Sequence, residues 1–173
     1  MFFKLSTLFK ILIYTILFSQ TILASSYSKD NVIFQYPSGW TVSDEVDNDG
    51  WRSIAIESGK STSLFIDIAP THLDSDLQSL SDNIYQTIKD KYKSHKLSNR
   101  TVKSIKATIN SKKVQGQRHN IDVKYQDKKA ILSGDLYIIK NANKTILIQT
   151  EFWRKNQSYA NSKFNMVLKS LKF

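Results

Sequence analysis

The sequence predicts an α+β fold, an α/β/α sandwich in which a crossover helix and a C-terminal helix cover a largely antiparallel sheet of six to eight strands. Two observations support this prediction. Short segments with alternating apolar residues, typical of half-buried strands, occur in both halves of the chain. Two segments, at about 74–93 and 157–171, instead carry apolar residues at helical spacing. Strands and helices of this kind bury their apolar sides by packing in layers.

The first half predicts three or four strands followed by the crossover helix. The strands are expected at 32–36, 54–56 and 64–68, with a turn at Ser58-Gly59 between the last two. The helix is expected from about Asp74 to Lys93, and Asp74 or Ser75 is well placed to cap its first turn.

The second half predicts a four-strand meander and the C-terminal helix. The strands are expected at 105–109, 121–125, 130–139 and 145–152. The last strand is apolar on both sides, which is typical of a central strand covered on two faces. The final helix, from about Gln157 to Leu171, has its apolar residues on one side.

The N-terminus has the pattern of a secretory signal peptide at residues 1–24. Lysines precede an almost wholly apolar run from 11 to 18, and small residues follow around Ala24. A membrane-spanning helix needs about 20 apolar residues, more than this run offers. We therefore expect cleavage near residues 24–26, no transmembrane anchor afterwards, and a single exported domain at 27–173, periplasmic or secreted.

The chain contains no cysteine. Thiol nucleophiles, disulfides and cysteine-bound zinc are therefore excluded, as is a lipid anchor attached to a cysteine at the cleavage point. A domain of about 150 residues can bury a sufficient core without such links. We expect packing to supply its stability and predict no cofactor.

The segment Phe34-Gln35-Tyr36-Pro37-Ser38-Gly39-Trp40 resembles the opening motif of the PsbP-like superfamily, in which a strand ends in an aromatic residue, Pro, any residue, Gly and Trp. The closing segment 167–173 and the order of strands and helices are similar to that family across essentially the whole mature chain. The family includes a lumenal photosystem II subunit, a nuclear-import factor that binds a small GTPase, and exported bacterial proteins. The resemblance implies the α/β/α fold and a binding or assembly role, and no family site residue maps onto the chain.

The alternative function is that of a small hydrolase or metal-dependent protein. His119 keeps phase with Ile121, and Asp135 keeps phase with Tyr137, so a His119–Asp135 pair across the sheet is conceivable. Each residue could equally be a hydrogen-bonded polar group near a strand end. No common hydrolase, metalloprotease or nucleotide-binding motif is present. We therefore predict that the chain is not an enzyme.

The acidic segment Asp44–Gly50 resembles the first half of a calcium-binding loop. Glu45, Asp47 and Asp49 alternate before the glycine, but Ile56 stands where such a loop needs a bidentate Glu. A solvated turn between strands is the expected structure, and weak calcium binding is left open.

The most unusual feature of the sequence is the amount and the uneven distribution of its positive charge. The chain has 25 Lys and Arg against 15 Asp and Glu, a net charge of +10, and 13 of the basic residues lie between Lys89 and Lys129 against three Asp. Such asymmetry favours an acidic protein or an anionic envelope component as partner, whereas export and the lack of a recognition motif disfavour nucleic acid. Lysines on alternate strand positions could also lie on opposite faces and serve only solubility.

The function that we predict is a small exported binding or assembly protein that acts through a basic surface on an acidic envelope partner. The candidate binding residues are the basic residues of the middle third and the residues after the last strand. They are Lys103, Lys106, Lys112, Lys113, Arg118, Trp153 and Arg154. Oligomeric state is not predicted.

Overall fold

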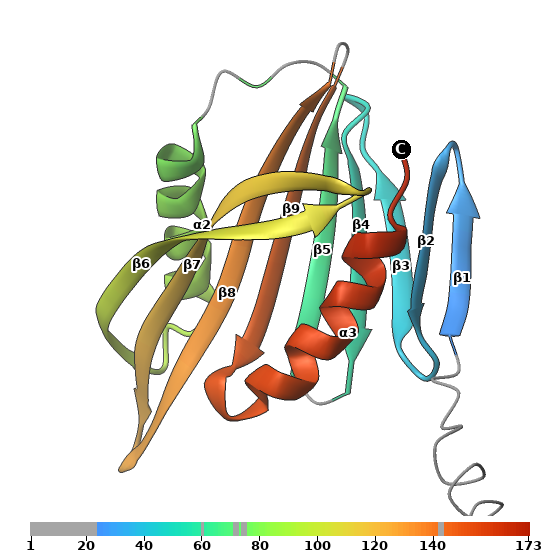
Figure 1. Ribbon diagram of the computed structural model, residues 1–173. Coiled ribbons are helices and arrows are strands. Elements are labelled where there is room, and N and C mark those ends of the chain that lie inside the picture. Colours follow the sequence, from blue (N-terminus) through green and yellow to red (C-terminus); the bar gives the residue numbers. More distant parts are fainter. Residues whose placement is uncertain (1–23, 60, 71–72, 74–75, 142–143) are drawn as a thin grey trace, which may run out of the picture.

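A computed structural model describes residues 24–59, 61–70, 73, 76–141 and 144–173 (Figure 1). The predicted signal peptide lies almost wholly outside these residues, as do the two predicted helix caps, Asp74 and Ser75. Within the described part of the chain, no helix is both long enough and apolar enough to cross a membrane.

Antiparallel strands form a seven-stranded sheet, in the order β3-β4-β5-β9-β8-β7-β6, and a separate hairpin of β1 and β2. The strands are β1 (Ala24–Lys29), β2 (Val32–Pro37), β3 (Thr41–Val46), β4 (Arg52–Ser58), β5 (Thr62–Ala69), β6 (Lys96–Ile109), β7 (Lys112–Tyr125), β8 (Lys128–Asn141) and β9 (Lys144–Trp153). The helices are α2 (Leu77–Lys91) and α3 (Gln157–Ser170), and a short 3-10 turn, η1 (Arg154–Asn156), precedes α3. The predicted α+β fold, with its large antiparallel sheet and C-terminal helix, is confirmed.

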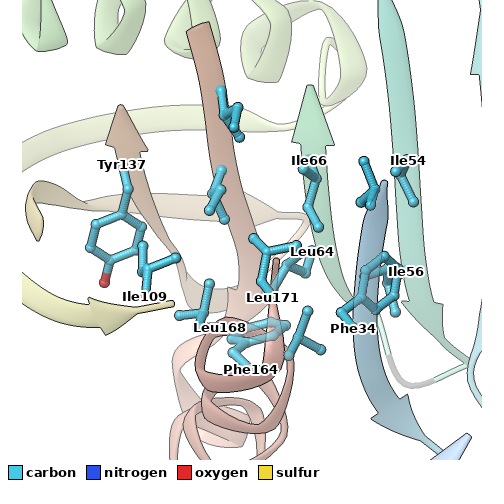
Figure 2. Close-up of a cluster of buried hydrophobic side chains, with 14 of the residues drawn as sticks. Phe34, Ile54, Ile56, Leu64, Ile66, Ile109, Tyr137, Phe164, Leu168 and Leu171 are labelled. Atoms are coloured by element: carbon cyan, nitrogen blue, oxygen red, sulfur yellow. The ribbon is translucent and has the colours of Figure 1, made fainter. Parts of the chain in front are cut away.

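The main core lies between the sheet, α3 and the β1–β2 hairpin (Figure 2). Phe164, Val167 and Leu168 of α3 pack on alternate residues of β4, β5 and β9 because side chains at every second strand position share a face. Phe34 closes the side of this core formed by β2. Backbone hydrogen bonds of 3.0 and 2.8 Å join Ile33 to Lys172, so the last residues of the chain complete the same layer.

A smaller core lies on the opposite face of the sheet, under α2. Ile88 of this helix packs with Ile121, Val123 and Leu132, but only Ser81 and Ile88 of α2 are buried. The helix covers β7 and β8, and four residues of β9 on this face are only half-buried: Leu147, Gln149, Glu151 and Trp153. β9 is the central strand of the sheet, as predicted, and its α2 face is less fully covered than its α3 face.

The cap of α2 also differs from the prediction. The carboxylate of Asp76 accepts a hydrogen bond of 2.7 Å from the backbone N–H of Ser79, so Asp76 is the N-cap residue. This interaction satisfies one of the backbone N–H groups that a helix leaves free in its first turn.

Two strands, β1 and β3, are absent from the sequence prediction, and a buried arginine ties them together. Arg52 of β4 donates hydrogen bonds of 2.8 and 3.0 Å to Asp44 of β3, and it also contacts the hydroxyl of Tyr27 of β1. Lys29 adds a contact of 2.8 Å to the same carboxylate. Tyr27 stacks on Phe34 with 4.7 Å between ring centroids, so this clamp fixes the hairpin beside the sheet.

We expect Asp44→Asn to lower the free energy of unfolding by about 3 kcal/mol, because the substitution leaves the buried guanidinium of Arg52 only the exposed carboxylate of Asp30, at 3.6 Å, as a counter-charge. The Arg52 guanidinium holds the pKa of Asp44 far below its usual range. The contribution of this carboxylate is therefore present above about pH 4, the unfolded pKa, and is lost as the pH falls below it.

Urea unfolding at pH 7 and in a series towards pH 3 measures both effects. Glu45→Gln, at the exposed neighbouring position, is the matched control and should change stability by less than about 0.5 kcal/mol. Equal stabilities of the two variants at pH 7 would contradict the role of the clamp.

Candidate functional site

Polar and charged side chains follow one face of β6, β7 and β8, on the side of the sheet where α3 packs. Directly opposed residues of antiparallel strands share a face, so the register assigns these side chains to rows that cross the three strands. The rows are Lys96–Lys124–Lys129, Ser98–Asp122–Ile131, Thr101–Asn120–Ser133 and Lys103–Arg118–Asp135. The ends of β7 and β8 that carry the first rows project past the start of α3 (Figure 1).

The first of these rows, Lys96, Lys124 and Lys129, is here called the lysine row. All three side chains are exposed, and none takes part in the ion pairs found among the described residues. Neighbouring strands lie about 4.8 Å apart, and like charges directly opposite each other destabilise a sheet. The lysine row therefore carries uncompensated positive charge that a bound anion would neutralise.

The lysine row borders an open groove of about 600 Å³. A register shift between Ser98 and Thr101 makes a bulge in β6, and Asn99 within it has a φ of 49°. Its side-chain amide donates a hydrogen bond of 2.9 Å to Asp122. The groove is lined by Lys96, Ser98, Asn99, Asp122, Val123, Lys124, Lys129, Ala130 and Ile131.

The fourth row, Lys103–Arg118–Asp135, differs from the lysine row because it contains an ion pair. Arg118 donates two hydrogen bonds, of 2.6 and 2.8 Å, to Asp135, and this carboxylate raises the pKa of the arginine. Tyr137 donates a longer hydrogen bond of 3.4 Å to the same carboxylate. Arg118 is thus compensated within the fold, whereas Lys103 opposite it is exposed.

The other predicted binding residues do not gather on this face. By their register, Lys106 and Lys113 point to the other side of the β6–β7 hairpin, whereas Lys112 shares the face of Arg118 but lies next to the hairpin tip, twelve residues along β7 from Lys124. Trp153 is half-buried and packs edge-on against a tyrosine of the α2 core, at 6.0 Å between ring centroids. Arg154 is exposed in η1. The structure therefore divides the predicted basic surface between two faces.

The pairing of His119 with Asp135, on which the alternative function as a hydrolase or metal-dependent protein depended, is not formed. His119 lies opposite Gly134 and Asp135 lies opposite Arg118, so the two side chains project from opposite faces of the sheet. Asp135 follows Gly134 directly on β8. Because adjacent strand residues alternate between faces, its side chain points away from the face that carries His119.

His119 instead joins a polar network beneath α2. Its Nδ1 lies 3.4 Å from the hydroxyl of Ser81, which also contacts the guanidinium of Arg100. Arg100 makes an ion pair of 2.6 Å with Asp82 and stacks over the ring of Tyr85 at 4.8 Å. Burial, followed by the nearby positive charge of Arg100, lowers the pKa of His119 to about 4.

The acidic segment that resembled a calcium loop is divided between a strand and a turn. Glu45 belongs to β3, while one carboxylate oxygen of Asp47 accepts backbone hydrogen bonds from Asp49 and Trp51 at 3.0 and 2.9 Å. The Asp47 side chain thus stabilises the turn itself. Among the described residues, no group of three or more His, Asp or Glu side chains is arranged to hold a metal ion.

No family model matches the chain, and no curated protein matches its sequence. Among solved structures, it is similar to the cyanobacterial PsbP of Synechocystis sp. PCC 6803, with 16% identity, 89% of this chain and 94% of that chain covered, and a TM-score of 0.47. It is also similar to LpqN of Mycobacterium tuberculosis, a protein involved in cell envelope biogenesis, with 10% identity, coverage of 87% and 91%, and a TM-score of 0.45. One of these two structures is a PsbP protein, and the opening motif of the sequence resembles the PsbP-like superfamily.

The low pKa of His119 predicts a pH-dependent stability. A histidine whose pKa falls from about 6.5 unfolded to about 4 folded binds more protons when unfolded, so the protein loses stability as the pH falls between these values. From pH 7 to pH 5 we expect the wild type to lose about 2 kcal/mol more than His119→Phe, as measured by urea unfolding.

His95→Phe is the matched control, because it removes another histidine while keeping a ring beside Tyr92 and Tyr125. A loss of pH dependence in His95→Phe equal to that in His119→Phe would mean that the effect is not specific to His119. An unchanged pH dependence in His119→Phe would show that His119 titrates alike in the folded and unfolded states.

Proposed function

We propose that this chain is an exported binding protein that holds an acidic segment of a partner protein against the lysine row. The observation that carries the proposal is the alignment of Lys96, Lys124 and Lys129 from three adjacent strands along one groove. Their charge has no ion-pair partner within the described residues. Export rests on the signal-peptide pattern of the first 24 residues. The proposal assigns no reaction to the chain.

The shape of the site favours a protein segment over a membrane. A flat bilayer cannot enter a groove, whereas an extended chain can lie along one. Lysine side chains present compact charges on flexible stems, which adapt to carboxylates at varied spacing. The hydroxyl of Ser98 and the amide of Asn99 supply hydrogen-bonding groups at the same edge.

The acidic residues of this face restrict where an anion can bind. Asp122 lies in the row next to the lysines, and Asp135 already compensates Arg118. An anionic segment is therefore repelled from the middle of the face and attracted to the lysine row. Lys103 adds positive charge farther along β6.

We expect the triple substitution of Lys96, Lys124 and Lys129 by Gln to weaken binding of a fluorescent oligoglutamate peptide by about tenfold at low salt, because three exposed ion pairs contribute about 0.5 kcal/mol each. Fluorescence anisotropy measures this change. High salt should weaken the wild-type complex in the same direction.

The matched control replaces Lys106, Lys113 and Lys169 by Gln, which removes the same charge from exposed positions away from the lysine row. This control should bind the peptide almost as the wild type does. Equal losses in both variants would mean that only net charge matters and would contradict the proposal. Binding to phosphatidylglycerol vesicles but not to the peptide would assign the surface to a membrane instead.

A further inference from the structure

We propose that a second site, under α2 and independent of the lysine row, binds the hydroxyl end of an uncharged, mainly apolar molecule. A cavity lies between this helix and the opposite face of the sheet. Its walls are mostly aliphatic, with His119 as the polar side chain on β7. The aliphatic residues are Ile84, Ile88, Ile121, Leu132 and Leu136.

The first argument is the unsatisfied nitrogen of His119. The side chain is 6% exposed, and its Nε2 is buried without a hydrogen-bond partner within the described part of the protein. A buried polar atom of this kind is costly to leave unpaired, and most such atoms in folded proteins have a partner. The cavity in contact with His119 is where a partner can be supplied.

The second argument identifies the chemical group. The contact of 3.4 Å between His119 Nδ1 and the Ser81 hydroxyl is compatible with either neutral tautomer, so Nε2 either donates or accepts a hydrogen bond. A hydroxyl can play both roles. It therefore fits Nε2 in either tautomer, which a carbonyl oxygen or an ammonium group does not.

The third argument excludes an ionised ligand. Arg100 is the cation nearest to this network, and its charge is compensated by Asp82 at 2.6 Å. Burial keeps His119 uncharged at neutral pH. The two carboxylates that line the cavity, Glu151 and Asp135, are paired with Lys91 at 2.7 Å and with Arg118 at 2.6 Å. A carboxylate or an amine entering the cavity would therefore lose hydration without gaining a free counter-charge.

The size of the cavity determines that it can enclose the hydroxyl of the ligand but not its apolar chain. The space in the cavity that is open to a water-sized group is about 20 Å³, which holds about one such group and is suited to a hydroxyl. The remainder of the ligand must therefore extend out of the cavity towards solvent. Gln149 and Glu151 of β9 line it where α2 leaves the sheet half-covered, so an alkyl chain can run outward there.

The test is a titration of the protein with 1-octanol, followed by two-dimensional NMR of the backbone amides. We expect saturable shifts at Ile88, His119 and Leu132, and an affinity about tenfold lower in His119→Phe, because that variant keeps a ring but removes Nε2. Octanoate should bind more weakly than 1-octanol. His95→Phe and the lysine-row variant should both bind 1-octanol as the wild type does.

A second variant keeps the test informative if His119→Phe does not fold. Ile84→Phe enlarges a half-buried side chain at the cavity wall while leaving His119 in place, and it should also reduce binding. Absence of saturable binding to the wild type would mean that the cavity holds water only. Equal affinities of the wild type and His119→Phe, or shifts confined to other regions, would likewise overturn the proposal.

Discussion

The register of β7 between β6 and β8 decides which side chains of this protein can act together. Because strand residues alternate between faces, a slip of one residue would transfer every side chain of β7 to the other side of the sheet. Two glycines allow close packing in this part of the sheet, Gly116 between β7 and β8 and Gly134 between β8 and β9. A Cβ at Gly116 would collide with the ring of Tyr137, and a Cβ at Gly134 would collide with the carbonyl oxygen of Thr150. Close packing at these glycines therefore supports both candidate sites.

With this register, the two faces of β7 have different chemistry. Residues on the side of α3 include Arg118, Asp122 and Lys124, which are polar and partly or fully exposed. Residues on the side of α2 include His119 and Ile121, which are buried beneath the helix. One strand thus contributes to a charged groove and to an apolar cavity, and the thickness of the sheet keeps them apart.

The bulge in β6 connects the local sequence to both sites. An extra residue between Ser98 and Thr101 interrupts the alternation of this edge strand. On one side, Asn99 of the bulge borders the groove of the lysine row. On the other side, Arg100 reaches α2 and binds Asp82. The bulge places both of these residues opposite a single residue of β7, Ile121, so the strand keeps its pairing on either side of them.

The sequence by itself determined the elements whose apolar pattern is local. The alternation around Phe34 and in 64–68, and the helical stripe of 157–171, predicted strands and a helix that the structure contains. The pattern even placed His119 on the buried face of its strand. By contrast, β1 and β3 are mostly polar and exist through their pairing with neighbours, so no local signal marked them. The lysine row and the Arg118–Asp135 pair were decided only by tertiary structure, because cross-strand register depends on turns and packing far from the paired residues.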